Sequence, residues 1–243
     1  MIRQNKKLTA EVERLQEQNE LKTGWISLLT HDFKEAFGSL LWTIEAVENE
    51  TISKDDFFKL LTQIKQDAKK NLQTVTDTSE WLRTQMKDFE LKKSKIFVLD
   101  LFIKLRKDFE AKLKQKDIDF QFIGDESLIF HNDNLLIHYI LSKFTDNAIK
   151  YSHKKSVIHF EAKKAEDNTL VLSIIDEGVG MAISTQESLF TFQNAVFHGT
   201  EKEIGAGLRL KIARNFVYMI HGKVEVESTE NVGTKISIIL PLI

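Results

Sequence analysis

The apolar residues of the first fifty positions recur in heptads, and this spacing limits the folds open to the chain more than any other feature. With Leu8 at a d position, the residues that fall at a or d positions include Val12, Leu15, Asn19, Ile26, Leu29, Phe33, Ala36, Leu40 and Val47. A helix this polar needs a partner, because most helical stability in proteins comes from packing an apolar face. The pattern predicts a coiled-coil lead over residues 1–22 that runs into a helical bundle.

Two asparagines in this segment indicate how the partner is arranged. Asn5 and Asn19 both fall at a positions. A buried amide at an a position is satisfied best by its own copy in a parallel, in-register pair. We therefore expect a homodimer.

A second helical stretch follows the sequence NETISKDD. Ser53 is placed there as an N-cap, with Asp55 and Asp56 in the first turn. Apolar residues then recur at spacings of three and four from Phe57 to Phe89. Two such helices form a hairpin, and two hairpins in a dimer form a four-helix bundle.

The stretch LLTHDFKEAFGSL sets a histidine beside an aspartate within the first helical segment. On the heptad frame His31 falls at f, the outermost position, and Asp32 follows it. An f residue faces solvent, which argues against a core histidine. A surface histidine without a role stays the alternative at this point.

After residue 92 the pattern changes to one of alternating strands and helices. Strands are expected at 117–123, 157–164, 169–177, 223–229 and 234–242, and helices at 101–114, 132–151 and 208–220. These elements predict an α/β sandwich of one mixed sheet and helices. The fold class expected for the whole chain is α+β, with domains at 1–22, 23–92 and 93–243.

Composition excludes several classes of protein. The net charge is −2 with acids and lysines interleaved, so we expect no nucleic-acid partner. The chain has no cysteine, which fits a reducing compartment. No apolar run approaches the length of about 18 residues that a membrane span requires. We expect a cytoplasmic location, either alone or as the cytoplasmic part of a membrane-anchored sensor.

The segment IIDEGVGM places an acid and two glycines directly after an apolar strand. Asp176 is suited to accept a hydrogen bond from an exocyclic amine such as that of adenine, while Gly178 and Gly180 let the backbone approach a ligand closely. Turns use the same residues, so the motif alone leaves an ordinary turn open.

Two further motifs suit the binding of phosphates. Gly205 and Gly207 precede a helix in IGAGLRL, where backbone N–H groups can face an anion, although a flexible loop entering a helix would look the same. In FTDNAIKYS, Asn147, Lys150 and Tyr151 lie within about one helical turn. An amide oxygen suits Mg²⁺ held mainly by phosphates, and a lysine one turn on can meet those phosphates.

Taken in order, these stretches resemble a sensor histidine kinase of two-component systems over nearly the whole chain. THDFKEAFGSL resembles the phospho-acceptor box, ILSKFTDNAIKYS the asparagine box, IIDEGVGM the first glycine box, SLFTFQ the phenylalanine box, GAGLRL the second glycine box, and NVGTKISIILPL the closing strand pair. The resemblance implies a Bergerat-type ATP-binding domain that phosphorylates His31 and passes the phosphoryl group to the receiver domain of a response regulator.

The resemblance also implies roles for individual residues. Asp176 would hold the adenine amine and Asn147 would ligate Mg²⁺. The remaining nucleotide-binding positions would be Lys150, Tyr151, Gly178, Gly180, Gly205, Gly207 and Leu208. His31 would be the nucleophile through Nε2, and Asp32 would draw off the proton of the other ring nitrogen. Adjacent helical residues do not face each other, so Asp32 must turn toward the ring by its choice of rotamer.

Four positions depart from the family pattern. Lys143 stands in place of a first asparagine, Ala36 in place of a proline, and Arg209 in place of the last glycine of the second glycine box. Glu35 stands where a threonine or asparagine would orient a water, so we expect weak phosphatase activity. These departures keep open a catalytically weak pseudokinase that acts as a dimeric scaffold. A related ATPase or chaperone would not explain His31 on a helical hairpin.

Near this histidine, Leu41 and Trp42 fall at the b and c positions of the heptad. Exposed apolar residues there would suit the docking of a response regulator. The alternative is that the second helix covers these two side chains.

Overall fold

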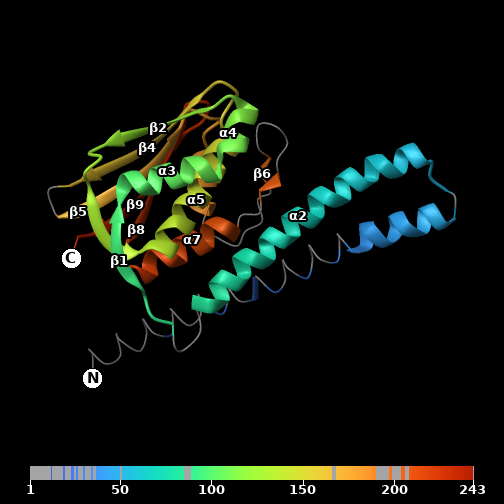
Figure 1. Cartoon of the computed structure of the whole chain (residues 1–243), viewed down its shortest axis with the longest axis horizontal. Helices are drawn as coiled ribbons and strands as arrows, with labels where there is room; N and C mark the ends of the chain where they lie inside the picture. Colours follow the sequence, from blue (N-terminus) through green and yellow to red (C-terminus); the bar gives the residue numbers. More distant parts are fainter. Residues whose placement is uncertain are drawn as a thin grey trace. The chain divides into compact units, whose positions relative to one another are not determined.

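The computed structural model describes residues 37–49, 51–84, 89–165, 168–189, 197–198, 204–205 and 208–242, together with isolated positions before residue 37. The chain divides into two compact units, Met1–Phe89 and Glu90–Ile243 (Figure 1). The α+β class predicted from the sequence is confirmed. The predicted coiled-coil lead lies outside the described residues, apart from two helical positions.

In the first unit, residues 37–48 are helical and α2 runs over Lys54–Thr84. The predicted N-cap at Ser53 is confirmed, because its Oγ accepts a hydrogen bond from the Asp56 backbone N–H at 3.1 Å. The Ser53 hydroxyl also donates to the Asp56 carboxylate at 2.8 Å. The short connection between the two helical segments suits a helical hairpin.

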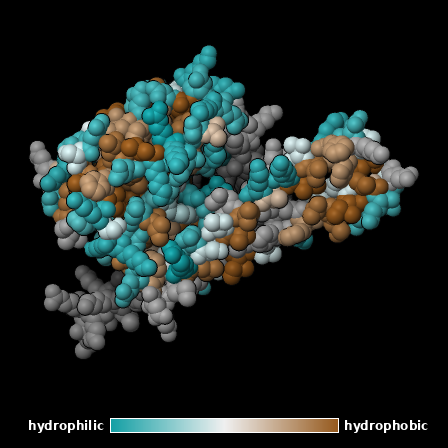
Figure 2. All heavy atoms as spheres, viewed as in Figure 1, coloured by the Kyte–Doolittle hydropathy of each residue, from teal (hydrophilic) through white to brown (hydrophobic). Residues whose placement is uncertain are grey.

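Apolar side chains gather on the exposed surface of this helical unit (Figure 2). Those on the first segment are Phe37, Leu40, Leu41, Trp42, Ile44 and Val47, and those on α2 include Phe58, Leu61 and Leu72. No helix among the described residues is both long enough and apolar enough to cross a bilayer.

The second unit is built on a mixed five-stranded sheet with the order β2-β4-β5-β9-β8. The strands are β2 (Asp119–Gly124), β4 (Val157–Lys164), β5 (Thr169–Asp176), β8 (Lys223–Thr229) and β9 (Gly233–Pro241). β2 and β4 run parallel, and the other neighbours are antiparallel. Side chains at alternate positions of the central strands are buried, because successive residues point to opposite faces.

Helices cover one face of this sheet (Figure 1). They are α3 (Val98–Asp108), α4 (Glu110–Lys116), α5 (Asn134–Tyr151) and α7 (Leu208–Met219). The short α6 (Ile183–Ser188) lies between β5 and α7 in the sequence. A small pair of strands, β6 (Phe197–His198) and β7 (Ile204–Gly205), precedes α7. The helix predicted at 101–114 is instead two helices, because Phe109 leaves helical geometry at φ −104° and ψ 6°.

Four phenylalanines fill the space between α3 and the sheet. The Phe102 ring lies 5.1 Å from that of Phe120 and 6.2 Å from that of Phe160, measured between ring centroids. Phe122 packs against both Phe102 and Phe160. Large aromatic groups at this spacing supply much of the area buried in the domain.

A second, two-stranded sheet joins β1 (Lys93–Phe97) to β3 (Ile129–Asp133). Sequence analysis did not predict β3, because its residues HND are polar and lead directly into α5. Asp133 ends the strand and caps the helix: its Oδ1 accepts from the backbone N–H groups of Leu135 at 3.0 Å and Leu136 at 3.2 Å. The helix therefore begins at Asn134 and not at the predicted residue 132.

The cap at Asp133 yields a test of the fold. We expect Asp133→Ala to lower the free energy of unfolding by about 1–2 kcal/mol, because the N-terminal N–H groups of α5 lose their acceptor. Asp133→Asn should lose far less, since asparagine is an equally good N-cap. Urea denaturation followed by far-UV circular dichroism measures both, and equal midpoints for the two variants would contradict the assignment.

Candidate functional site

The carboxylate of Asp176 lies at the end of β5 with 8% of the residue exposed. Its Oδ1 accepts a hydrogen bond from the Gly178 backbone N–H at 2.9 Å, and the Thr234 backbone N–H also donates to the carboxylate. Burial raises the pKa of Asp176 to about 6 against these two hydrogen bonds, which lower it. The strand thus holds a desolvated acceptor in a fixed orientation.

The loop after Asp176 packs tightly against the backbone of other elements. A Cβ added at Gly178 would lie 2.3 Å from the Tyr151 carbonyl oxygen, and the Val179 N–H donates to that same oxygen at 3.1 Å. Gly180 adopts φ +61°, and a Cβ there would lie 1.9 Å from the Thr229 carbonyl oxygen. Both glycines are therefore required by contacts within the chain, a reason distinct from the ligand approach considered in the sequence.

This contact brings the end of α5 beside the end of β5. Asn147, Lys150 and Tyr151 occupy the last two turns of α5, and all three are half-buried. The Lys150 ammonium donates to the Tyr151 hydroxyl at 3.2 Å and lies 4.8 Å from the centroid of its ring. The structure thus joins Tyr151 to the loop of Asp176 and places Asn147 one turn earlier on the same helix.

Two of the departures from the family pattern have defined surroundings. The Lys143 ammonium lies 4.5 Å from the centroid of the Tyr139 ring. Arg209 forms an ion pair with Asp146, with 3.4 Å between Nη1 and Oδ2, and Asp146 also pairs with Lys112. The Arg209 side chain thus links the start of α7 to α5.

The donor set can be compared with the needs of Mg²⁺. Among the described residues, no group of three or more acidic or histidine side chains is placed to hold a metal ion. Mg²⁺ in nucleotide sites is bound by one or two protein ligands together with phosphates and water. A single amide oxygen from Asn147 fits that requirement.

Several predicted residues lie outside the described part of the chain. They are His31, Asp32 and Gly207, as well as Glu35 and Ala36. Gly205 ends β7, and Leu208 is the first residue of α7. The roles given to these residues stay predictions.

The residues that sequence analysis missed contact the backbone of the elements that carry the site. Gly233 has φ +140°, and a Cβ there would lie 2.0 Å from the Asp176 carbonyl oxygen. Lys116 is buried and bonds to carbonyl groups at the end of α5. Its sequence context, KLKQKD, is that of a solvated lysine, so no signal distinguished it.

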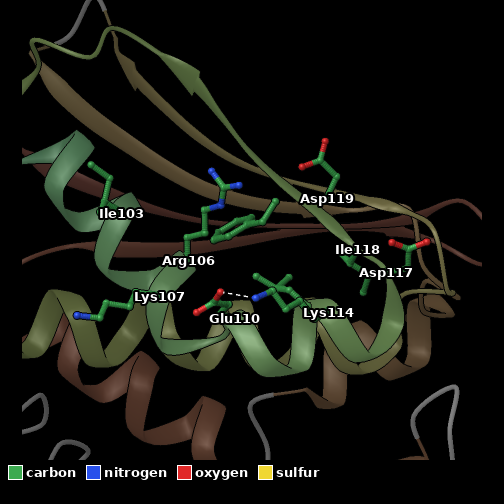
Figure 3. A pocket seen from close by; sticks show the side chains of 10 residues that line it. Ile103, Arg106, Lys107, Glu110, Lys114, Asp117, Ile118 and Asp119 are labelled. Carbon is green, nitrogen blue, oxygen red and sulfur yellow. Dashed lines mark hydrogen bonds and ion pairs between the residues drawn. The ribbon is translucent and has the colours of Figure 1, made fainter.

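A cleft of about 450 Å³ lies elsewhere, between α3, α4 and β2 (Figure 3). Its charged lining includes Arg106, Lys107 and Asp119, and Glu110 pairs with Lys114 at 2.6 Å. Charges of both signs line it, and none of the predicted site residues contributes to it. The cleft is therefore separate from the site described above.

The raised pKa of Asp176 predicts a pH-dependent effect on stability. The folded chain binds the proton more tightly than the unfolded chain, whose value is 3.8, so stability due to this group is complete below pH 3.8 and is lost as the pH rises to about 6. Asp176→Asn keeps one acceptor oxygen and removes the ionisation, and the loss of the other oxygen is a cost that does not vary with pH. The stability of this variant relative to wild type should rise between pH 4.5 and 7.5 by about 2 kcal/mol.

Thermal or urea unfolding at several pH values measures this difference. Glu177→Gln, which removes the exposed carboxylate next along the chain, is the matched control. A difference between Asp176→Asn and wild type that stays constant with pH would refute the assignment.

Comparison with known proteins places this site within a family. Residues 132–243 match the family described as histidine kinase-, DNA gyrase B-, and HSP90-like ATPase. The sensor histidine kinase YclK of Bacillus subtilis is 25% identical over 100% of this chain and 50% of its own length. The histidine protein kinase SaeS of Staphylococcus aureus is 26% identical over 96% of this chain and 67% of its own.

A solved structure gives the same fold. The histidine kinase ThkA, crystallised in complex with the response regulator protein TrrA, superposes with a TM-score of 0.71 at 20% identity, over 95% of this chain and 64% of that one. The chain thus spans half the length of YclK and about two thirds of SaeS. Residues 132–243 thus match an ATPase domain of this type, and nearly the whole chain is similar in sequence to sensor histidine kinases.

Proposed function

We propose that the chain is the cytoplasmic core of a sensor kinase that moves the γ-phosphoryl group of Mg-ATP to Nε2 of His31 and then to an aspartate of a response regulator. The observation that carries the proposal is the junction of β5 and α5. There the buried Asp176 carboxylate, the Gly178 turn and the end of the helix bearing Asn147 are held together by backbone contacts.

Asp176 suits the recognition of adenine. A carboxylate has about four acceptor positions, so it retains capacity after accepting the N–H groups of Gly178 and Thr234. An exocyclic amine is a donor of the kind that a desolvated carboxylate binds strongly. Gly178 and Gly180 fix the loop beside it.

The last turns of α5 suit the phosphates. Asn147 would ligate Mg²⁺ through its amide oxygen, while Lys150 and Tyr151 would donate to phosphate oxygens from the paired positions that they hold now. Gly205, Gly207 and Leu208 would shape the phosphate end of the pocket at the start of α7. Bound Mg²⁺ stabilises the charge that develops in phosphoryl transfer, and most of the remaining catalysis is positioning.

The chemistry at the acceptor requires a neutral imidazole. Nε2 of His31 forms the bond to phosphorus as the bond to the bridging oxygen breaks, which leaves ADP, and Asp32 accepts the proton from Nδ1. In the second step the phosphorus–nitrogen bond breaks as a carboxylate of the regulator takes the phosphoryl group. These roles rest on the phospho-acceptor motif in the sequence.

The helical unit supports the expected partners. Leu40 and Val47, which are exposed and lie at a positions of the heptad, suit a homodimer in which a second copy completes a four-helix bundle. The crystallised pairing of ThkA with a response regulator protein supports a regulator as the phosphoryl acceptor. In this proposal residues 1–22 form the coiled-coil lead, 23–92 the dimerisation and phosphotransfer domain, and 93–243 the catalytic domain.

Incubation with Mg²⁺ and γ-labelled ATP tests the kinase. We expect acid-labile, base-stable label on the wild type, and its loss in His31→Gln and in Asn147→Ala. His131→Gln and Asn49→Ala, at exposed positions elsewhere, should keep the label. Absence of label from a wild-type chain that still binds ATP would overturn the proposal in favour of a dimeric pseudokinase scaffold.

Docking of the regulator makes a separate prediction. Trp42 is 56% exposed and lies with the exposed Leu41 on the first helical segment. Truncating an aromatic anchor costs an interface more than about 1 kcal/mol, so Trp42→Ala should slow phosphotransfer to the regulator about fivefold. Autophosphorylation of the same variant serves as the control and should be unchanged. Normal transfer with normal autophosphorylation would exclude Trp42 from the docking surface.

A further inference from the structure

The side chain of Lys116 is buried at the end of α4, with 3% of the residue exposed. Its Nζ donates to the carbonyl oxygens of Ile149 at 3.0 Å, Lys150 at 2.8 Å and Ser152 at 3.5 Å. An ammonium group has three N–H donors, so these three carbonyls match its capacity. Lysine is rarely buried to this extent, because removing the charge from water is costly unless it is compensated.

The compensation comes from the end of α5. The last carbonyls of a helix have no partner within the helix, and the helix dipole makes this end negative. The Lys116 ammonium therefore caps α5 from another element of the fold. Its own carbonyl oxygen also accepts the N–H of Lys155 at 3.0 Å, and Asp119 donates its N–H to Ser156 at 3.1 Å. The chain after α4 is thus joined to the chain after α5.

The carbonyl of Tyr151 lies in the chain between two of the carbonyls that Lys116 binds. This same oxygen accepts the N–H of Val179 and contacts the position where Gly178 has no side chain. The Val179 carbonyl in turn accepts the N–H of Asn231 at 2.7 Å. A shift at the end of α5 would therefore be transmitted to the loop that begins at Asp176.

We propose that Lys116 is a positioning residue for nucleotide binding. By capping α5 it fixes the position of the Tyr151 carbonyl oxygen, which contacts the loop of Asp176 and Gly178. This inference rests on the proposed nucleotide site. In this role Lys116 supports the proposed ATP pocket without contacting adenine or phosphate. Its effect on the geometry of the loop can be measured separately from its effect on the stability of the domain.

Asp133 provides the matched control, because it caps the opposite end of the same helix. Asp133→Ala should weaken α5 and the domain without altering the contact at Tyr151. Lys116→Met keeps the length and apolar stem of the side chain but removes all of its donors. Lys116→Gln keeps amide donors, so it should recover part of the function and serves where the methionine variant folds poorly.

Hydrogen exchange in the nucleotide-free full chain tests positioning alone. The Val179 amide should exchange at least about tenfold faster in Lys116→Met than in wild type, because its acceptor at Tyr151 is no longer held. In Asp133→Ala the same amide should change no more than amides in the core of β5. Unchanged exchange at Val179 in a folded Lys116→Met chain would overturn the positioning role.

Calorimetric titration with a non-hydrolysable ATP analogue and Mg²⁺ tests the consequence for binding. At a temperature where every variant is fully folded, the dissociation constant does not depend on domain stability. We expect Lys116→Met to bind the ATP analogue about tenfold more weakly than wild type, which is the size of effect seen when a residue that orients a binding group is removed. The dissociation constant of Lys116→Gln should lie between those of Lys116→Met and wild type. That of Asp133→Ala should stay within about twofold of wild type.

The outcomes separate the two proposals. A wild-type chain that binds no nucleotide would overturn the proposed function, whereas the exchange at Val179 would still decide whether Lys116 positions the loop. Equal losses of affinity in Lys116→Met and Asp133→Ala would show that Lys116 acts through helix stability only and would overturn the inference.

Discussion

The hydrogen bond from the Val179 N–H to the Tyr151 carbonyl joins the two elements on which the proposed nucleotide site is built. One is β5, which ends in the buried Asp176, and the other is α5, which carries Asn147 and Lys150 near its C-terminus. A helix carbonyl that would otherwise lack a partner is used here to hold a loop. The adenine and phosphate ends of the proposed pocket are therefore fixed relative to each other by backbone groups.

This arrangement includes groups whose burial is energetically costly. A carboxylate with a pKa of about 6 and an ammonium with 3% of its residue exposed are both buried within the same domain. Gly178 and Gly180 add the entropy cost of glycine, since side chains at either position would collide with carbonyl oxygens. The packed aromatic cluster around Phe102 and the tightly paired central strands offset these costs. Functional sites commonly hold such locally unfavourable features, which the surrounding fold supports.

The elements in which apolar residues recur at a regular spacing were predictable from the sequence. Alternation identified β4, β5, β8 and β9, and Ser53 marked the start of α2 because a side-chain cap is a local signal. The break at Phe109 and the strand β3 were missed, because tertiary contacts and not local propensity decide them. For the site, Asp176 and its glycines could be named from spacing. Lys116 could not, because a capping lysine and a solvated lysine look alike until α4 is placed against α5.

The two cationic departures from the family pattern illustrate why a substituted letter does not by itself indicate lost activity. Lys143 lies over the Tyr139 ring and Arg209 pairs with Asp146, and both of these partners are residues of α5. Asp146 directly precedes Asn147, and the pair therefore ties the start of α7 to the turn of helix that would hold Mg²⁺. A glycine at position 209 could not make that link. The substitution thus replaces the backbone freedom of a glycine at the start of α7 with an ion pair between α7 and α5.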